Sequence, residues 1–378
     1  MTEARSIHDF HQNTTIARTD TKLKTQLNKH FKTDTLSLPE KSDLVSSTCD
    51  IITWAIVQAR KDYAHDPQRL VGLVSASSDA NALAVWGSTK YDWIVVSEGL
   101  MQLLYASADD MATRLTAAFP EMFQSQLGRR LQAVSPLSGG FQTSLGSFLY
   151  FAAISFFVGH EAGHHLAGHD GHYVSGAHAE LGDSSMAREG SNMTIEQALE
   201  IQADRIGLNI SRNAIAQLLS KLWEIRTFSE HEKLEYQRVL AILLNAGVMM
   251  SAVKIRPKTI EWSDVPGSTH PPAVARVVLL SMSLSRSIKL NFDSLDDVSR
   301  RWIRAKCLDV VAGATIRPGS QEDKVLQERL ARGGEPAAIR AVGIRKAMFD
   351  PQLAAYYEQI DNHLDAIRAQ LLPRFKAP

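Results

Sequence analysis

The spacing of apolar positions changes along the chain, and these changes locate the predicted elements. Apolar residues at helical spacing predict a long amphipathic helix over residues 41–66, and a helix is also expected around residues 15–31. Three short runs rich in Val, Ile and Trp follow within residues 69–97 and predict strands. Ser97 is the expected N-cap of the next helix. The order predicts a small group of strands between helices.

Helical patterns dominate the rest of the chain. They cover residues 98–134, residues 194–253 and most of the chain after residue 272. Stretches rich in Gly, Ser or Pro interrupt them and predict loops, at 135–140, 180–193 and 254–272. A largely helical chain with one small strand cluster predicts an α+β fold.

One apolar run resembles a membrane segment but is too short to be one. Residues 148–159 are strongly apolar, whereas a membrane-spanning helix needs about 20 such residues. The run leads directly into His160. We therefore expect the buried first half of the helix that carries His160, and no stable membrane span.

Composition narrows the class of protein. Of the 378 residues, 44% are hydrophobic and 22% are charged, as in soluble globular proteins. Equal numbers of basic and acidic residues, 41 each, argue against a broad nucleic-acid interface, although a local basic patch stays possible. Cys49 and Cys307 alone cannot form a disulfide framework. The first fifteen residues lack an apolar stretch, so a cytoplasmic location is expected.

A cluster of histidines carries the candidate chemistry. His160 and His164 lie four residues apart in the motif His-Glu-Ala-Gly-His, which places them on one face of a helix. Both can therefore bind one tetrahedral Zn²⁺ at about 2.0–2.1 Å. Glu161 points to the side of this pair and can take a proton from a water molecule that the metal polarises. Gly163 is expected to leave the site uncrowded.

The third ligand has two candidate positions. Glu200 can bind the metal from a downstream helix, and Asp204, one turn later, can accept the ring N–H of a ligating histidine. Asp170, six residues after His164, is the competing ligand, although Ala167 stands where a turn glycine is expected and Gly168 follows it. Further histidines could also contact a metal, namely His169, His172 and His178.

Four segments in this order resemble the gluzincin family of zinc metallopeptidases, in particular the CAAX-prenyl endopeptidases and the HtpX-like peptidases. They are residues 77–104, 160–169, 200–207 and 268–276. The resemblance implies a zincin-like core, in which a small β-sheet packs over two active-site helices. With the helical patterns on either side, we expect an N-terminal helical region, a catalytic domain and a C-terminal helical region, at 1–69, 70–286 and 287–378.

The same resemblance assigns roles within the motifs. It implies one Zn²⁺ per chain, bound by His160, His164 and Glu200, with Glu161 as general base and Asp204 as support. Family members usually carry transmembrane helices around the His-Glu motif, and the sequence predicts none here. The chain therefore resembles a soluble relative, and membrane-protein substrates cannot be transferred to it.

Substrate binding is predicted on the second strand. An exposed edge strand offers backbone N–H and C=O groups to an extended peptide, which predicts Asn81, Ala82 and Leu83 as substrate-binding residues. An ordinary core strand is the alternative. The loop at 180–193 could form a mobile lid over this groove.

The motif Ser-Thr-His-Pro-Pro at 268–272 suggests two further site residues. His270 and Arg276 could stabilise the oxyanion that forms when water attacks a peptide carbonyl. In the alternative interpretation, His270 caps the helix that starts at the prolines, and Arg276 pairs with a carboxylate in the core.

These residues together predict a zinc-dependent endopeptidase that acts on proteins or peptides. A non-catalytic metal-binding or interaction protein that keeps a metallopeptidase fold is the alternative. Glu161 favours the enzyme, because a site that only binds metal does not need a general base.

Overall fold

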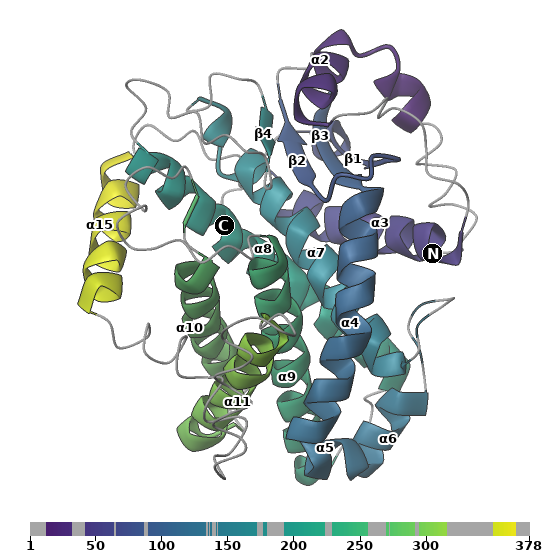
Figure 1. Ribbon diagram of the computed structural model, residues 1–378, viewed down its shortest axis with the longest axis vertical. Helices are drawn as coiled ribbons and strands as arrows, with labels where there is room; N and C mark the ends of the chain where they lie inside the picture. The colour runs from purple at the N-terminus through teal and green to yellow at the C-terminus, as the bar shows by residue number, and fades with distance from the viewer. Residues whose placement is uncertain are drawn as a thin grey trace.

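A computed structural model gives the fold. It describes residues 13–31, 42–63, 66–86, 90–133, 135, 137, 141, 143–171, 177–179, 193–223, 229–255, 270–271, 273–291, 295–315 and 351–367. These residues are mostly helical and include one small sheet, which confirms the predicted α+β class (Figure 1). The predicted domain boundaries stay predictions, and the second of them falls within a helix, at residues 286 and 287.

The sheet contains four strands in the order β1-β3-β2-β4. β1 pairs with β3 in parallel, and β2 pairs with β3 and with β4 antiparallel. The strands are β1 (Leu70–Ser75), β2 (Ala82–Val85), β3 (Asp92–Ser97) and β4 (Ala177–Ala179). The first three were predicted, and every residue in them is buried.

Both faces of the sheet are covered, because alternate side chains enter different cores. Leu83, Val85 and Trp93 pack on one side with α2 (Thr21–His30) and the short helix before it. Ala82 and Ile94 face the main helical core on the other side.

The prediction that β2 is an exposed edge strand is wrong. β4 covers its free side, with Leu83 opposite Ala179 and Val85 opposite Ala177. The backbone of Leu83, Ala84 and Val85 therefore lies between two neighbouring strands. The sequence did not reveal this pairing because β4 has only three residues and lies far along the chain from β2.

The helices form a bundle below the sheet (Figure 1). The main ones are α3 (Asp43–Asp62), α4 (Glu98–Ala118), α5 (Pro120–Gln124), α6 (Gln126–Ala133), α7 (Ser144–Leu166), α8 (Met193–Trp223), α9 (Glu230–Ile255), α10 (Ala273–Asn291), α11 (Asp297–Thr315) and α15 (Pro351–Ile367). Two single turns of 3-10 helix are η1 (Pro67–Arg69) and η2 (His169–Gly171). Ser97 caps α4 as predicted, since its side chain accepts a hydrogen bond from Leu100 N–H.

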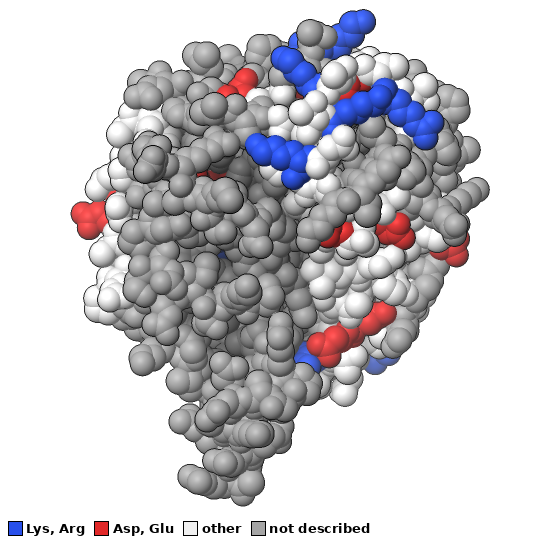
Figure 2. All heavy atoms as spheres, turned by 45° about the horizontal axis from the view of Figure 1, so that its top comes forward, with Lys and Arg blue, Asp and Glu red and all other residues white. Residues whose placement is uncertain are grey.

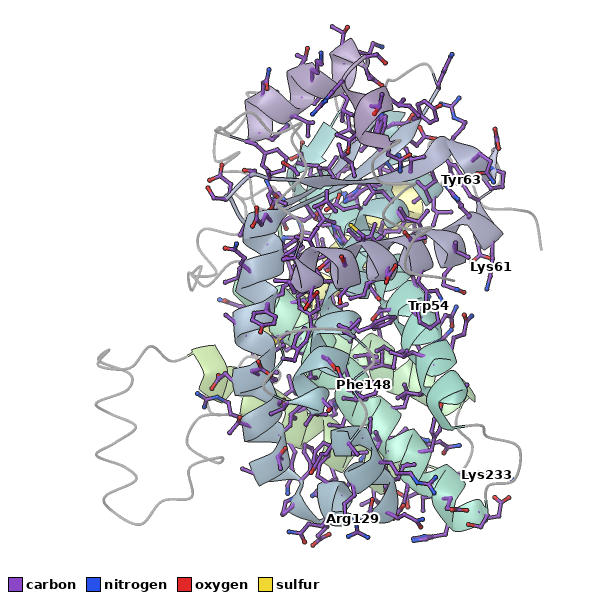
Figure 3. All side chains as sticks on the ribbon, turned by 90° about the vertical axis from the view of Figure 1, so that its right-hand side faces the viewer. Trp54, Lys61, Tyr63, Arg129, Phe148 and Lys233 are labelled. Carbon is purple, nitrogen blue, oxygen red and sulfur yellow. The ribbon has the colours of Figure 1, made fainter. Side chains whose placement is uncertain are left out.

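α7 occupies the centre of the bundle. It is the one described helix that is long and apolar enough to cross a membrane, and its apolar window is completely buried within the fold. This confirms the predicted core helix, in which residues 148–159 lead into His160. Figure 3 shows Phe148 of α7 inside the bundle and Trp54 on α3. The Trp54 ring packs edge-on against Phe151 of α7 at 5.3 Å between ring centroids.

Some local predictions need correction or lie outside the described residues. The helix expected around residues 15–31 is interrupted, because Asp20 leaves the helical conformation and caps α2 through a hydrogen bond from Leu23 N–H. The predicted helix over 41–66 is confirmed as α3, which ends earlier at Asp62. The proposed lid lies outside the described residues apart from its last residue, and so does most of the connection at 254–272.

A local cluster of basic side chains lies on the sheet side of the molecule, where Figure 2 shows Lys and Arg gathered together. Lys22, Lys24 and Lys29 of α2 are exposed there. A pocket of about 530 Å³ beside α2 is lined by residues that include Lys22, Lys90 and Tyr91. None of the candidate site residues lines this pocket.

Candidate metal centre

The close approach of α7 and α8 creates the candidate site. A Cβ atom on Gly207 of α8 would lie 2.7 Å from the backbone nitrogen of His160, and one on Gly159 of α7 would lie 2.9 Å from Gly207 Cα. A Cβ atom on Gly163 of α7 would lie 3.0 Å from Ala203 Cα on α8. Gly163 therefore serves the helix contact rather than leaving space over the site. Only residues without a side chain allow the two helices to come this close.

This contact brings three potential ligands together. His160, His164 and Glu200 are completely buried, and their ligand atoms all lie within 4.8 Å of one another. His160 Nε2 lies 3.1 Å from His164 Nε2 and 3.5 Å from Glu200 Oε2. His164 Nε2 lies 3.4 Å from Glu200 Oε1. The cluster could hold a metal ion.

The spacing fits a small tetrahedral ion. A tetrahedral ion with bonds of about 2.0–2.1 Å places its ligand atoms about 3.3 Å apart. The two histidine Nε2 atoms are 3.1 Å apart, and each lies at a similar distance from one oxygen of Glu200: His164 Nε2 is 3.4 Å from Oε1 and His160 Nε2 is 3.5 Å from Oε2. Two imidazoles and one carboxylate are also a donor set that zinc uses in catalytic sites, with a fourth position left for water or substrate.

Asp204 orients the first histidine. Its Oδ1 atom lies 2.8 Å from His160 Nδ1, and because a carboxylate accepts, His160 donates this hydrogen bond. Nε2 of the neutral ring then carries the lone pair that a metal needs. Arg276 donates two hydrogen bonds to the same carboxylate, from Nε to Oδ2 at 2.9 Å and from Nη2 to Oδ1 at 2.6 Å. The predicted supporting position of Asp204 matches this geometry.

Arg276 and His270 take different positions in the structure. Both are buried, but Arg276 is bound to Asp204, which is the ion pair of the alternative interpretation. His270 lies nearer the ligands, with Nε2 3.9 Å from Glu200 Oε2. Arg276 is thus held by Asp204, whereas the imidazole of His270 lies beside Glu200. Of the two prolines that follow His270, only Pro271 belongs to the described residues.

The C-terminal helix α15 covers one side of this arrangement. Its apolar face packs against Leu199 and Ile201 of α8 and against Val278 of α10. Burial, followed by the neighbouring Tyr357, raises the pKa of Tyr356, and Arg276 acts in the opposite direction. The side chain of Tyr356 therefore stays neutral close to the charged groups of the site.

The remaining histidines of the cluster have separate roles. His165 Nε2 donates to the backbone oxygen of Trp93, at 3.0 Å, and so joins α7 to β3. His169 contacts His164 at 2.8 Å between their Nδ1 atoms. His172 lies outside the described residues, and of His178 only the backbone in β4 is described.

Asp170 does not join the candidate ligands. Among the described residues, the group with converging ligand atoms contains Glu200 and omits Asp170. The turn after α7 explains this placement: Gly168 adopts a φ of 73°, a left-handed conformation that suits glycine. The left-handed turn is thus made by Gly168, one residue after the position of Ala167 where a turn glycine was expected.

The predicted substrate residues lie in the sheet. Ala82 and Leu83 belong to β2, and the backbone oxygen of Asn81 accepts hydrogen bonds from the N–H and the hydroxyl of Ser97. These contacts build the sheet and the start of α4. Their predicted role in peptide binding rested on an exposed edge strand, whereas β4 pairs with β2 from Leu83 to Val85.

Several contacts that shape the site were not anticipated. The Arg276 contact to Asp204 and the His164 contact to His169 join residues whose partners sequence spacing does not identify. Gly159 and Gly207 carried a usable signal, because small residues four apart at 159 and 163 and at 203 and 207 favour close helix packing.

Comparison of the chain with models of known protein families, with curated proteins and with solved structures finds no match.

Proposed function

We propose that this protein is a zinc-dependent endopeptidase that hydrolyses peptide bonds in protein or peptide substrates. The observation that carries the proposal is the buried group of His160, His164 and Glu200, whose ligand atoms lie within 4.8 Å of one another. Glu161, which follows His160 directly, is also completely buried. The resemblance of four sequence segments to gluzincin peptidases supports the same function.

The chain's own residues account for the proposed chemistry. When bound, zinc would lower the pKa of a water molecule and polarise the substrate carbonyl. Glu161 accepts a proton from the attacking water at its carboxylate, while the water oxygen forms a bond to the carbonyl carbon. Glu161 then passes the proton to the leaving nitrogen as the C–N bond breaks.

The second role belongs to His270. Negative charge develops on the carbonyl oxygen during the attack, and a hydrogen-bond donor placed near that oxygen stabilises it. His270 is buried and lies 3.9 Å from Glu200, measured from Nε2 to Oε2. Arg276 acts indirectly, by fixing Asp204 and through it His160.

The architecture is consistent with this proposal. A small sheet lies above α7 and α8, which carry all of the proposed ligands (Figure 1). We interpret this pair of helices and the sheet as a zincin-like core of the gluzincin type. α7 is packed as an internal helix, which is compatible with a soluble enzyme, and we propose that it acts in the cytoplasm.

Hydrolysis of an unfolded test protein is the experiment that tests the proposal. The purified protein should degrade it, lose this activity with a zinc chelator and regain it when zinc is restored. Glu161→Gln should abolish hydrolysis while zinc stays bound, because glutamine cannot accept the proton. The matched control Glu121→Gln makes the same change at an exposed position of α5 and should leave hydrolysis unchanged.

The same experiment separates the enzyme from its alternative. If the wild-type protein holds zinc through the three proposed ligands but degrades no test protein or peptide, the chain is a non-catalytic metal-binding protein. If Glu161→Gln hydrolyses as fast as the wild type, Glu161 is not the general base.

A further inference from the structure

His169 lies where it can act on a proposed metal ligand. α7 ends at Leu166, and the left-handed Gly168 turns the chain back so that His169, completely buried, faces His164. The Nδ1 atoms of the two rings are 2.8 Å apart. The other nitrogen of His169, Nε2, lies 3.0 Å from Oε1 of Gln202 on α8.

The direction of these hydrogen bonds follows from the partners. The amide oxygen of Gln202 can only accept, so His169 donates from Nε2–H. A neutral His169 ring then has a bare Nδ1, which accepts the hydrogen bond from Nδ1–H of His164. With its proton on Nδ1, His164 presents the lone pair of Nε2 to the cluster, where Glu200 Oε1 lies 3.4 Å away. The acceptor at Gln202 thus determines which nitrogen of His169 carries the proton, and His169 in turn determines which nitrogen of His164 carries it.

We propose that His169 and Gln202 are positioning residues that set the tautomer and the orientation of His164 for metal binding. The inference rests on the metal site of the proposed function. In this arrangement the two proposed histidine ligands have separate hydrogen-bond acceptors. Asp204 accepts the hydrogen bond from Nδ1–H of His160. His169, which Gln202 holds, accepts the hydrogen bond from Nδ1–H of His164. Both ring nitrogens of His169 have a partner in this arrangement, so His169 is not itself a metal ligand.

Substitutions at position 169 test the acceptor. His169→Phe keeps a ring in the same space but removes the acceptor, and we expect it to weaken zinc affinity by about 10–100-fold. His169→Asn places an amide oxygen near the position of Nδ1 and should restore most of that affinity. Zinc affinity is measured by competition with a chelator of known affinity, and the absorption spectrum of the Co²⁺ form reports the ligand geometry.

Substitutions at position 202 test the direction of the relay. Gln202→Glu keeps an acceptor for His169 and should leave zinc affinity close to that of the wild type. Gln202→Lys offers donors only, which favours a proton on Nδ1 of His169 and therefore on Nε2 of His164, where zinc must bind. We expect Gln202→Lys to weaken zinc affinity by more than tenfold.

The charge of the lysine needs its own control. In the His169→Asn background the relay no longer passes through an imidazole, so Gln202→Lys there reports only the effect of the added charge. Asn209→Lys adds the same charge at an exposed position of α8. Both controls should change zinc affinity much less than Gln202→Lys alone.

The outcomes separate this inference from the proposed function. A wild-type protein that binds zinc, together with unchanged affinity in His169→Phe and in Gln202→Lys, overturns the relay and leaves the metal site standing. Equal loss in His169→Phe and His169→Asn, with an equal fall in the thermal stability of the metal-free protein, shows a packing role and also overturns it. A wild-type protein that binds no zinc refutes the proposed function itself.

Discussion

Gly207→Ala should separate the two ligand-bearing helices and weaken metal binding. The new Cβ would lie 2.7 Å from His160 N and 2.9 Å from Phe156 O, both backbone atoms that cannot rotate away. Ordinary contact for a Cβ starts at about 3.4 Å, so α7 and α8 must move apart locally by about 0.7 Å. Glu200 and Gly207 both lie on α8, whereas the two histidine ligands lie on α7, so this movement carries Glu200 away from the histidines.

The size of the effect follows from the ligand geometry. The distances from Glu200 to the two histidines are 3.4 and 3.5 Å, and the movement would widen them to about 4.1–4.2 Å if it reached the site undiminished. A zinc site tolerates deviations of about 0.2 Å in its bonds. We therefore expect at least about a tenfold loss of zinc affinity, or about 1.4 kcal/mol of binding free energy.

Global stability should respond less than metal binding. Alanine favours a helix interior over glycine by about 1 kcal/mol, whereas overpacking costs about 1–3 kcal/mol. The free energy of unfolding of the metal-free protein should therefore fall by about 0–2 kcal/mol. Denaturant unfolding in the presence of a chelator measures the free energy of unfolding of the metal-free protein. Chelator competition measures zinc affinity separately.

Gly247→Ala is the matched control for this substitution. A Cβ on Gly247 of α9 would lie 2.7 Å from Ala152 Cβ on α7, so it overpacks the same central helix on a face without ligands. It should lower stability by a similar amount and leave zinc affinity unchanged. Gly163→Ala, with a closest contact of 3.0 Å, should weaken zinc binding less than Gly207→Ala. Wild-type zinc affinity in Gly207→Ala would refute the argument that this helix contact sets the ligand spacing.

Four other predictions concern single residues of the site and of the core. Asp204→Ala should weaken zinc affinity by about 10–100-fold without abolishing binding, as chelator competition would show, because Asp204 orients His160 but is not a ligand. Arg276→Ala should lower the free energy of unfolding by about 3–5 kcal/mol, since it leaves a buried carboxylate without its ion pair; His270→Ala should instead slow hydrolysis by about 10²–10³-fold with zinc retained. Burial, with a smaller effect from Asp50, raises the pKa of the Cys49 thiol to about 12. Alkylation of native Cys49 at pH 8 should therefore be about 10³-fold slower than that of a free thiol, and fast labelling without unfolding would contradict its buried position.

The sequence predicts the parts of the site that depend on local spacing. His160 and His164 share a helix face because they are four residues apart, and Glu200 and Asp204 do so for the same reason. The apolar run before His160 marks a buried helix, and Ser97 marks the start of α4. These features depend on neighbours within one or two turns, which a single sequence contains.

The parts that failed depend on contacts between distant segments. β2 is an inner strand because the three residues Ala177–Ala179 pair with it, and so short a segment has no recognisable strand pattern. The role of Arg276 depends on where α10 lies relative to α8, which spacing along the chain does not determine. Asp170 was a plausible ligand until the position of the turn at Gly168 was known.

Zinc content per chain, measured on wild type and single substitutions, tests the central claim most directly. The account predicts one zinc ion in the wild-type protein and in Asp170→Ala, and loss of stoichiometric zinc in His160→Ala, His164→Ala and Glu200→Ala. Zinc that persists in all three of these variants, or that disappears in Asp170→Ala while Glu200→Ala keeps it, would contradict the assigned site.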